Sequence, residues 1–286
     1  MDLMQIWINS ANRANIGIKT VAQMPEDWHD RVFIAVPSCQ FKQYVKQHKG
    51  IGTIVKIPKS VPKFLSSQRQ WVAENANSNC HYVWMMDDDL KFMFRDDEMK
   101  LKNAEEAHMD QMWIAMMEHL SADDMACVGI STRLGNNRET ADYADISRVT
   151  RCFAFDVELF MQLGINLAPF EPFCMQDFHM NLSFLEQGYR NRVIYSFAQG
   201  DSGSNSKGGC SSYRTPKVLA KVSKWMEKNH KGFVKTKTKR TKGSWEGFEK
   251  DEEGYVTRTD VMIYWKKAYE AAVRRKRTSG GLMKFI

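Results

Sequence analysis

Short apolar runs alternate with polar, helix-compatible segments along the amino-terminal half of the chain. The apolar runs have the length of strands and cover Leu3–Ile8, Arg31–Pro37, Thr53–Pro58 and Tyr82–Met86. The segments between them suit helices, at Ile18–Met24, Gln40–His48 and Ser66–Asn77. Strands that alternate with helices in this way predict right-handed βαβ units around a parallel sheet.

The alternation continues less regularly in the second half. We expect a helix over Asn103–Leu120, whose methionines suit core packing better than a ligand site. The other expected elements are strands at Met125–Ser131, Arg148–Asp156 and Arg192–Phe197, a loop at Thr132–Ala144, and helices at Val157–Leu163 and Phe178–Gln187. The prediction is an α/β fold, with a Rossmann-type mixed, mostly parallel sheet flanked by helices.

The carboxyl-terminal part of the chain has a different composition. From Lys217 to Lys242, ten lysines and arginines accompany one acid, Glu227. Helices are expected over Val218–Lys228 and Tyr264–Arg277, whereas Lys235–Lys242 alternates basic and hydroxyl residues without a core pattern. We find no internal repeat and no long linker. We therefore expect one domain, residues 1–215, with a basic, mainly helical extension, residues 216–286, packed on it.

Overall composition narrows the class of protein. An apolar fraction of 43% in 286 residues suits a folded domain, and a net charge of +7 suits a polyanionic partner. No apolar run approaches the roughly 20 residues that a membrane span needs, and the amino terminus lacks a signal-peptide pattern. The six cysteines form no CxxC pair. We therefore expect a cytoplasmic protein without a membrane partner.

Three consecutive acids, Asp87, Asp88 and Asp89, follow the apolar run Tyr82–Met86 directly. A run of this kind indicates a strand buried on both faces, and open α/β sheets bind ligands at the carboxyl ends of their strands. Adjacent carboxylates repel one another unless they are solvated or bound to a cation. Mg²⁺ and Mn²⁺ prefer such oxygen ligands and often share them with phosphates. The acids therefore indicate a metal and phosphate site; the alternative is an acidic turn after a core strand.

Other polar residues are expected at the same edge of the sheet. Asn12 and Arg13 follow the first strand, Pro37 ends the second, and Arg69 lies on the helix before the acidic strand. An arginine there offers a bidentate fork to phosphate, although an ordinary helix-surface arginine is the alternative. The chain has neither the P-loop pattern nor a GxGxxG after its first strand, so we expect neither a P-loop nor a dinucleotide-binding fold.

Asp177 stands between apolar residues at the start of an expected helix. The helix dipole stabilises a carboxylate at this position, and its role is either a helix cap or a general base that accepts the proton of an acceptor hydroxyl. His179 is a weaker candidate for a base or metal ligand. Asp201 and Asn205, in a glycine- and serine-rich loop, are candidates for closing the site.

Together these features resemble the GT-A glycosyltransferase fold with its DxD motif. The resemblance covers roughly Leu3–Tyr213 and implies that Asp87–Asp89 bind Mn²⁺ or Mg²⁺ together with a nucleotide sugar, with Asp87 and Asp89 as metal ligands. Arg151-x-Phe153-x-Phe155-Asp156, followed by Gln176–Leu182 and Gly188-Tyr189, is more specifically similar to the glycosyltransferases associated with TET/JBP-type DNA hydroxylases. Gln176 replaces the glutamate that is usual in that family, and no clear downstream histidine completes the metal site.

The resemblance implies a metal-dependent transferase that moves a sugar from a nucleoside-diphosphate sugar, such as a UDP-sugar, to 5-hydroxymethylcytosine in bacteriophage DNA, within the host cytoplasm. The expected DNA contacts are the basic residues of the carboxyl-terminal extension, Lys235, Lys237, Lys239, Arg240 and Lys242. Two alternatives stay open. One is a transferase that acts on a protein, glycan or small molecule, and the other is a non-enzymatic nucleic-acid-binding module on the same scaffold. Clustered acids also occur in two-metal nucleases, which the preceding strand order favours less.

Overall fold

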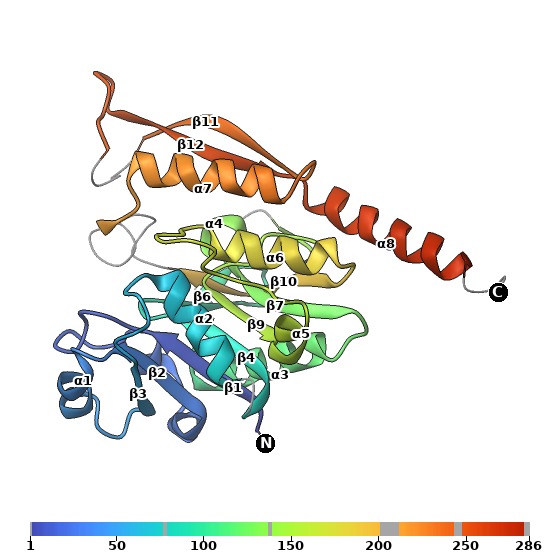
Figure 1. The fold of residues 1–286 in the computed structure, drawn as a ribbon. Coiled ribbons are helices and arrows are strands. Elements are labelled where there is room, and N and C mark those ends of the chain that lie inside the picture. Colours follow the sequence, from blue (N-terminus) through green and yellow to red (C-terminus); the bar gives the residue numbers. More distant parts are fainter. Residues whose placement is uncertain (1, 77–78, 137–138, 201–211, 243–247, 283–286) are drawn as a thin grey trace.

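A ten-stranded mixed sheet forms the centre of the molecule, with helices on both faces (Figure 1). The computed structural model describes residues 2–76, 79–136, 139–200, 212–242 and 248–282. The strand order is β3-β2-β1-β4-β9-β7-β10-β5-β6, and β8 pairs with β10. The predicted α/β fold class is confirmed.

The amino-terminal half is the predicted parallel βαβ arrangement. Its strands are β1 (Asp2–Asn9), β2 (Val32–Pro37), β3 (Thr53–Ile57) and β4 (Cys80–Asp87), and its helices are α1 (Phe41–Gln47) and α2 (Leu65–Ala76). β1 pairs in parallel with both β2 and β4, and β2 pairs in parallel with β3. The carboxyl ends of these strands therefore meet at one edge of the sheet, where Asn9 of β1 lies in register with Asp87 of β4.

The expected helix Ile18–Met24 is wrong in type and extent. Two short 3₁₀ helices, η1 (Val21–Gln23) and η2 (Glu26–Arg31), replace it. Gly17 has a φ of +81°, which no α-helix accommodates, and Pro25 has no backbone N–H to donate within a helix. Few residues remain between these two positions for an α-helix. The hydroxyl of Thr20 is instead used in the turn after β4, described below.

An antiparallel strand interrupts the sheet beside the acidic strand. β9 (Cys152–Asp156) lies between β4 and β7 (Met125–Thr132) and runs antiparallel to both. The expected strand Arg148–Asp156 is thus shorter at its start. Because β9 is reversed, its amino end reaches the edge where β4 ends, and the amide of Asp87 donates to the carbonyl of Arg151 at 2.9 Å.

The sheet separates two apolar cores, as its alternating pattern requires. One face packs on α3 (Glu106–Leu120), whose Met109, Met112 and Met116 are buried, which confirms their predicted packing role. The other face packs on α2, α5 (Val157–Gln162) and α6 (Gln176–Glu186). Both faces of β4 are therefore covered, and the central part of the strand, Val83–Met86, is fully buried.

Three short strands lie outside the predicted pattern. β5 (Lys91–Arg95) and β6 (Leu101–Asn103) extend the sheet beyond β10 (Arg190–Gly200), and β8 (Tyr143–Asp145) also pairs with β10. The expected loop Thr132–Ala144 contains the short helix α4 (Arg133–Asn136) and the start of β8. These elements are brief, so their sequences carry little periodic signal; pairing with β10 stabilises β5 and β8, and β6 pairs with β5.

The carboxyl-terminal extension contains a hairpin between two helices. α7 (Pro216–Asn229) and α8 (Trp265–Leu282) flank the antiparallel pair β11 (Val234–Lys242) and β12 (Tyr255–Ile263). Lys235–Lys242, which shows no core pattern in the sequence, is therefore part of a strand. A third core joins this unit to α6: Leu182 and Leu185 pack with Val222, Met226 and Val261. The extension is packed on the sheet domain through α6 (Figure 1).

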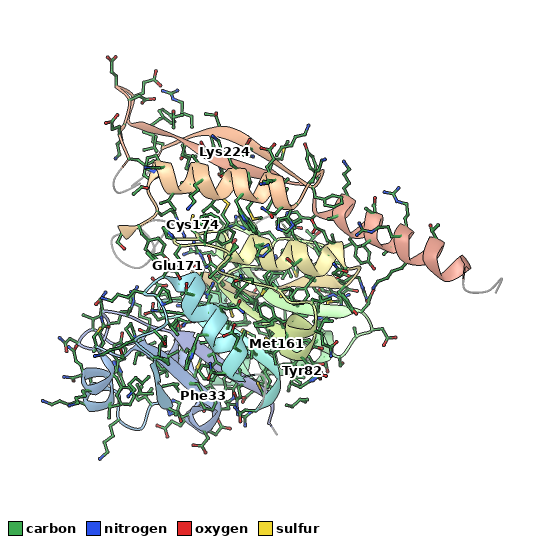
Figure 2. The ribbon with its side chains drawn as sticks, viewed as in Figure 1. Phe33, Tyr82, Met161, Glu171, Cys174 and Lys224 are labelled. Carbon is green, nitrogen blue, oxygen red and sulfur yellow. The ribbon has the colours of Figure 1, made fainter. Side chains whose placement is uncertain are left out.

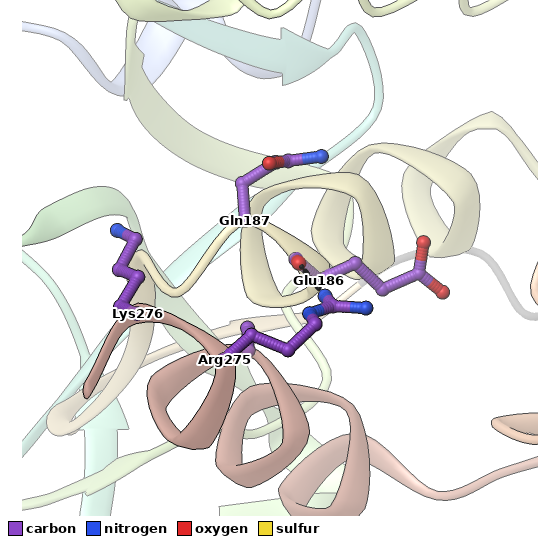
Figure 3. Close-up of a pocket in the computed structure, with 5 residues that line it drawn as sticks. Glu186, Gln187, Arg275 and Lys276 are labelled. Atoms are coloured by element: carbon purple, nitrogen blue, oxygen red, sulfur yellow. Dashed lines mark hydrogen bonds between the residues drawn. The ribbon is translucent and has the colours of Figure 1, made fainter. Parts of the chain in front are cut away.

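A shallow hollow of about 350 Å³ lies where α8 crosses the end of α6 (Figure 3). The Arg275 guanidinium donates to the Glu186 carbonyl at 2.6 Å, and the Lys276 ammonium lies 4.4 Å from the centre of the Tyr189 ring. These contacts cap the carboxyl end of α6, where a cation is favoured. No described helix has the length and apolar character needed to cross a membrane.

Candidate active site

The three acids lie where β4 ends and the chain turns. Thr20, which is buried, braces this turn because its hydroxyl donates to the Asp87 carbonyl at 2.6 Å and accepts from the Leu90 amide at 3.0 Å. The turn holds the three carboxylates close together at the carboxyl edge of the parallel strands. This is the position expected from the sequence.

Arg69 lies against the first acid. Its side chain comes from the first turns of α2, is 3% exposed, and donates to Asp87 at 2.6 Å. The guanidinium also lies 5.6 Å from the centre of the Phe153 ring on β9. Arg69 is therefore buried against Asp87 and is not an ordinary helix-surface arginine, while its role in phosphate binding stays a prediction.

The loop after β1 engages the other two acids. The Arg13 guanidinium lies 2.9 Å from Asp88 and 3.1 Å from Asp89, and the Ser10 hydroxyl donates to Asp88 at 2.6 Å. The Tyr44 hydroxyl from α1 lies 2.9 Å from the Ser10 hydroxyl and accepts from the Arg13 amide at 3.0 Å. The loop is thus fixed between α1 and the acids.

Asn12 and Pro37 complete this side of the edge. Asn12 has a φ of 61°, a left-handed conformation that asparagine tolerates, and exchanges two hydrogen bonds with the Gln40 amide. Pro37 ends β2, and its carbonyl accepts from the backbone N–H of Gln40 at 2.8 Å, whereas Asn12 bonds to the side-chain amide of Gln40. The ends of β1 and β2 are therefore tied together, beside Arg13 and the acids.

Burial and mutual repulsion change the acidity of the cluster. Burial raises the pKa of Asp87, with the charges of Asp89 and Asp177 adding to the rise and those of Arg69 and Arg151 opposing it. Burial likewise raises the pKa of Asp88 to about 6, against the Ser10 hydrogen bond and the Arg13 charge. The site has more negative charge than its arginines fully compensate, which favours an additional cation.

Asp177 faces this cluster from another element. It lies in the first turn of α6, and the Thr150 hydroxyl donates to its carboxylate at 2.8 Å. Its effect on the pKa of Asp87 places the two carboxylates within electrostatic range of each other. Asp177 does not cap the helix, because the residue at the cap position is Met175. The Thr150 hydroxyl comes from the segment just before β9, and the Asp177 side chain remains partly exposed.

His179 is turned toward the carboxyl-terminal extension and away from the acids. Its Nδ1 lies 2.8 Å from His230 Nε2, and His230 Nδ1 lies 2.9 Å from a Glu186 carboxylate oxygen. Its ring also packs edge-on against Trp225. Burial lowers the pKa of His179 to about 3, so the ring is neutral near pH 7.

The remaining candidates lie elsewhere on the chain. Asp201 and Asn205 fall outside the described residues. The predicted DNA contacts Lys235, Lys237, Lys239, Arg240 and Lys242 lie on β11, in the hairpin rather than on the sheet that carries the acids. Within the hairpin, Arg240 pairs with Asp251 and Glu253, and Lys239 lies 3.8 Å from Asp260.

Several residues of the site were absent from the sequence prediction. Thr150 and Arg151 reach the edge only because β9 is antiparallel, and Tyr44 reaches it from the buried face of α1. Arg151 has a φ of 64°, and its carbonyl anchors Asp87. The positive φ of an arginine has no sequence signal. Thr150 and Arg151 could have been identified only from the position and direction of β9 in the sheet, which the hydrophobic pattern does not give.

Buried polar atoms without a partner lie beside the acids. Both amide atoms of Asn9, the Ser66 hydroxyl and Arg69 Nε have no hydrogen-bond partner in the described part of the chain. Asn9 is in register with Asp87, and Ser66 lies one helical turn before Arg69. Unsatisfied buried groups are costly, and a bound ligand or ordered water commonly satisfies them.

The donor set suits a hard divalent cation that is shared with a ligand. Among the described residues, no group of three or more histidine, cysteine or acidic side chains is arranged as a complete metal site. Carboxylate oxygens from Asp87 and Asp89 are the ligands that Mg²⁺ and Mn²⁺ prefer, and such ions usually complete their coordination with water and phosphate oxygens. The uncompensated charge described above fits this use of the cluster.

The two arginines are predicted to differ in their effect on stability. Arg69→Gln should lower the free energy of unfolding by about 3 kcal/mol, because it leaves Asp87 without its buried partner. Arg13→Gln should cost about 1 kcal/mol or less, since Arg13 is 24% exposed. Urea denaturation followed by tryptophan fluorescence measures both. Adding Asp87→Asn to Arg69→Gln should recover part of the loss; a further loss would contradict the pairing.

Some solved proteins are similar to this chain in fold. Solved structures with a similar fold include S. aureus TarS 1–349, with a TM-score of 0.51 at 11% identity over 79% of this chain and 65% of that chain. Another is GalNAc-T7 with UDP, GalNAc and Mn²⁺, with a TM-score of 0.48 at 10% identity over 74% of this chain and 47% of that chain. The chain thus spans less than two thirds of either protein. No match was found among curated proteins.

A sequence profile carries the family assignment. The profile described as TET-Associated Glycosyltransferase matches residues 4–209, which include the acids, Arg69 and Asp177. The match covers most of the chain and ends before the basic extension. The chain belongs to the TET-associated glycosyltransferase family, and its fold is that of the GT-A glycosyltransferases.

Proposed function

We propose that this glycosyltransferase takes a sugar from a nucleotide-sugar donor, in a metal-dependent reaction, and transfers it to the hydroxyl of 5-hydroxymethylcytosine in DNA. The observation that carries the proposal is the crowding of Asp87, Asp89 and Asp177 at one edge of the sheet, with Arg13 and Arg69 beside them. The arginines suit phosphates, the acids suit a divalent ion, and Asp177 suits the acceptor side.

The donor would lie across the ends of β1, β2 and β4. The residues proposed to hold the nucleotide sugar are Asn12, Arg13, Pro37, Arg69, Asp87 and Asp88. Asp87 and Asp89 would hold Mn²⁺ or Mg²⁺, which would neutralise charge on the departing diphosphate. Arg13, which is paired with two acids, would exchange these contacts for the donor's phosphates.

Asp177 is proposed to accept the proton of the acceptor hydroxyl. The hydroxyl oxygen then bonds to the anomeric carbon, while the bond from that carbon to the diphosphate oxygen breaks. The Thr150 hydroxyl, which donates to Asp177, would fix the orientation of the carboxylate. The amino end of α6 favours Asp177 as an anion, as a base requires.

The proposed acceptor rests on the family and on charge. The family's description associates it with TET, and the resemblance to glycosyltransferases associated with TET/JBP-type DNA hydroxylases implies a hydroxymethylated base in DNA as the acceptor. The net charge of +7 and the basic extension suit a nucleic-acid acceptor. We propose residues 1–215 as the transferase domain and residues 216–286 as the extension that contacts DNA, with Lys235, Lys237, Lys239, Arg240 and Lys242 among its basic residues. A duplex base would have to be flipped out to reach Asp177.

Transfer to DNA is directly testable. Incubation of the protein with hydroxymethylated DNA, Mn²⁺ and a panel of UDP-sugars should increase the mass of the modified nucleoside by one sugar residue with at least one donor. Asp89→Asn should abolish the gain, because it removes a proposed metal ligand. Unmodified cytosine in the same sequence is the control. If the folded protein produces no mass gain with any of the donors, the proposal that DNA is the acceptor is refuted.

The role of Asp177 predicts a specific kinetic effect. Asp177→Asn should lower kcat by about 10²–10⁴, the usual contribution of a general base, with little change in the KM for the donor. Thr150→Val removes the hydrogen bond but keeps the carboxylate, so its effect should be much smaller. Steady-state kinetics measures both variants. A rise in donor KM with unchanged kcat in Asp177→Asn would instead place Asp177 in donor binding.

A further inference from the structure

One face of α7 carries a row of lysines that the sequence analysis did not separate from the other basic residues. Lys217, Lys221, Lys224 and Lys228 are all exposed, and their spacing places them on one side of the helix. Leu219, Val222, Ser223 and Met226 form the opposite, buried side. We refer to the four lysines as the α7 lysine face. At 1.5 Å per residue it is about 16 Å long.

The positive charge of this face is not compensated locally. No acid forms an ion pair with any of the four lysines in the described part of the chain. The only acid on α7, Glu227, is engaged elsewhere, since it accepts from the Thr236 hydroxyl of β11 at 2.8 Å. The hairpin differs: Arg240 already pairs with Asp251 and Glu253. All four lysines of the α7 face are therefore available to an anion, whereas part of the positive charge on β11 is already paired.

Side-chain contacts connect the α7 lysine face to the edge that carries the acids. The Lys221 ammonium lies 4.1 Å from the centre of the Phe170 ring, and the next residue, Glu171, hydrogen-bonds to Ser67 in the first turn of α2. Just before α7, the Tyr213 hydroxyl accepts from the Leu65 amide at 3.3 Å. Figure 2 shows Glu171 near the amino end of α2, and Lys224 further along on α7. The lysine row is thus linked to the amino end of α2, the helix that carries Arg69.

We propose that the α7 lysine face is the track for the phosphate backbone of the acceptor DNA, and that the hairpin mainly supports α7 from behind. The inference rests on the proposed function. Each strand of duplex DNA carries one charge per about 3.4 Å of axis, so a face of about 16 Å meets several phosphates of one strand. The buried contacts of Val234, Val256 and Val261 with α7 give the hairpin its supporting role.

A membrane surface fits this face less well. Helices that bind at a membrane surface insert an apolar face beside their basic residues. The apolar face of α7 is already buried in the core shared with α6 and the hairpin, and none of the large exposed apolar side chains in the described residues lies on α7. The lysine face therefore has charge but no apolar surface to insert.

Salt-dependent binding tests the track. The double variant Lys217→Gln/Lys224→Gln removes two exposed charges whose side chains make no hydrogen bond, ion pair or ring contact among the described residues. The slope of log K for a hydroxymethylated duplex against log salt should become shallower by about 2, one per lost phosphate contact. The matched control, Lys46→Gln/Lys49→Gln, removes two exposed lysines at the end of α1, and its slope should equal that of the wild type.

A second measurement separates this inference from the proposed function. Sugar transfer to the free nucleoside 5-hydroxymethyldeoxycytidine should be equal in the wild type and the α7 double variant, whereas the KM for duplex DNA should rise in the variant alone. If the α7 double variant has the same salt slope for duplex binding and the same KM for duplex DNA as the wild type, the α7 track is overturned and the transferase proposal stays intact. No transfer by the wild type to nucleoside or DNA would refute the proposed function itself. Binding to phosphatidylserine vesicles without binding to DNA would also overturn the track.

Discussion

The site depends on the compensation of carboxylates by arginines at one edge of the sheet. Three adjacent acids after a fully buried strand would repel one another strongly if they stood alone. Arg69, itself buried, balances Asp87 from the α2 side, and Arg13 balances Asp88 and Asp89 from the loop after β1. Two neighbouring crossovers of the fold thus supply the charges that the acidic turn needs. In the proposed function, a nucleotide-sugar donor would bring phosphates to the arginines and share a cation with the acids, so the same charges would be re-paired on binding.

Much of this edge was predictable because its strands are parallel. Asn12, Arg13, Pro37 and the acids each follow a strand of the first half, and parallel strands end at a common edge. The position of Arg69 beside the acids also followed from the crossover that joins α2 to β4, whereas its ion pair with Asp87 was not predicted. Local pattern was therefore sufficient wherever consecutive elements are also neighbours in space.

The contribution of β9 was not predictable in the same way. Its apolar run suggests a strand but not its direction, and only the antiparallel direction brings Thr150 and Arg151 to the acids. The hairpin shows a second limit. Lys235–Lys242 alternates with a period of two, yet its partner β12 lies beyond an intervening segment, and the buried residues that hold the pair come mainly from β12 and α7. Because nearly all residues of β11 are basic or carry a hydroxyl, the segment has no alternation of apolar and polar residues that would indicate a strand. His179, expected near the chemistry, instead joins α6 to α7 through His230.

Calorimetric titration with UDP, in the presence of Mn²⁺ and again with the metal removed by a chelator, tests the central claim most directly. If the acids and arginines form a site for a nucleoside diphosphate shared with a divalent ion, binding should be strong with Mn²⁺ and should weaken sharply without it. Equal affinity in both conditions, or no binding in either, would contradict the account of the acidic edge.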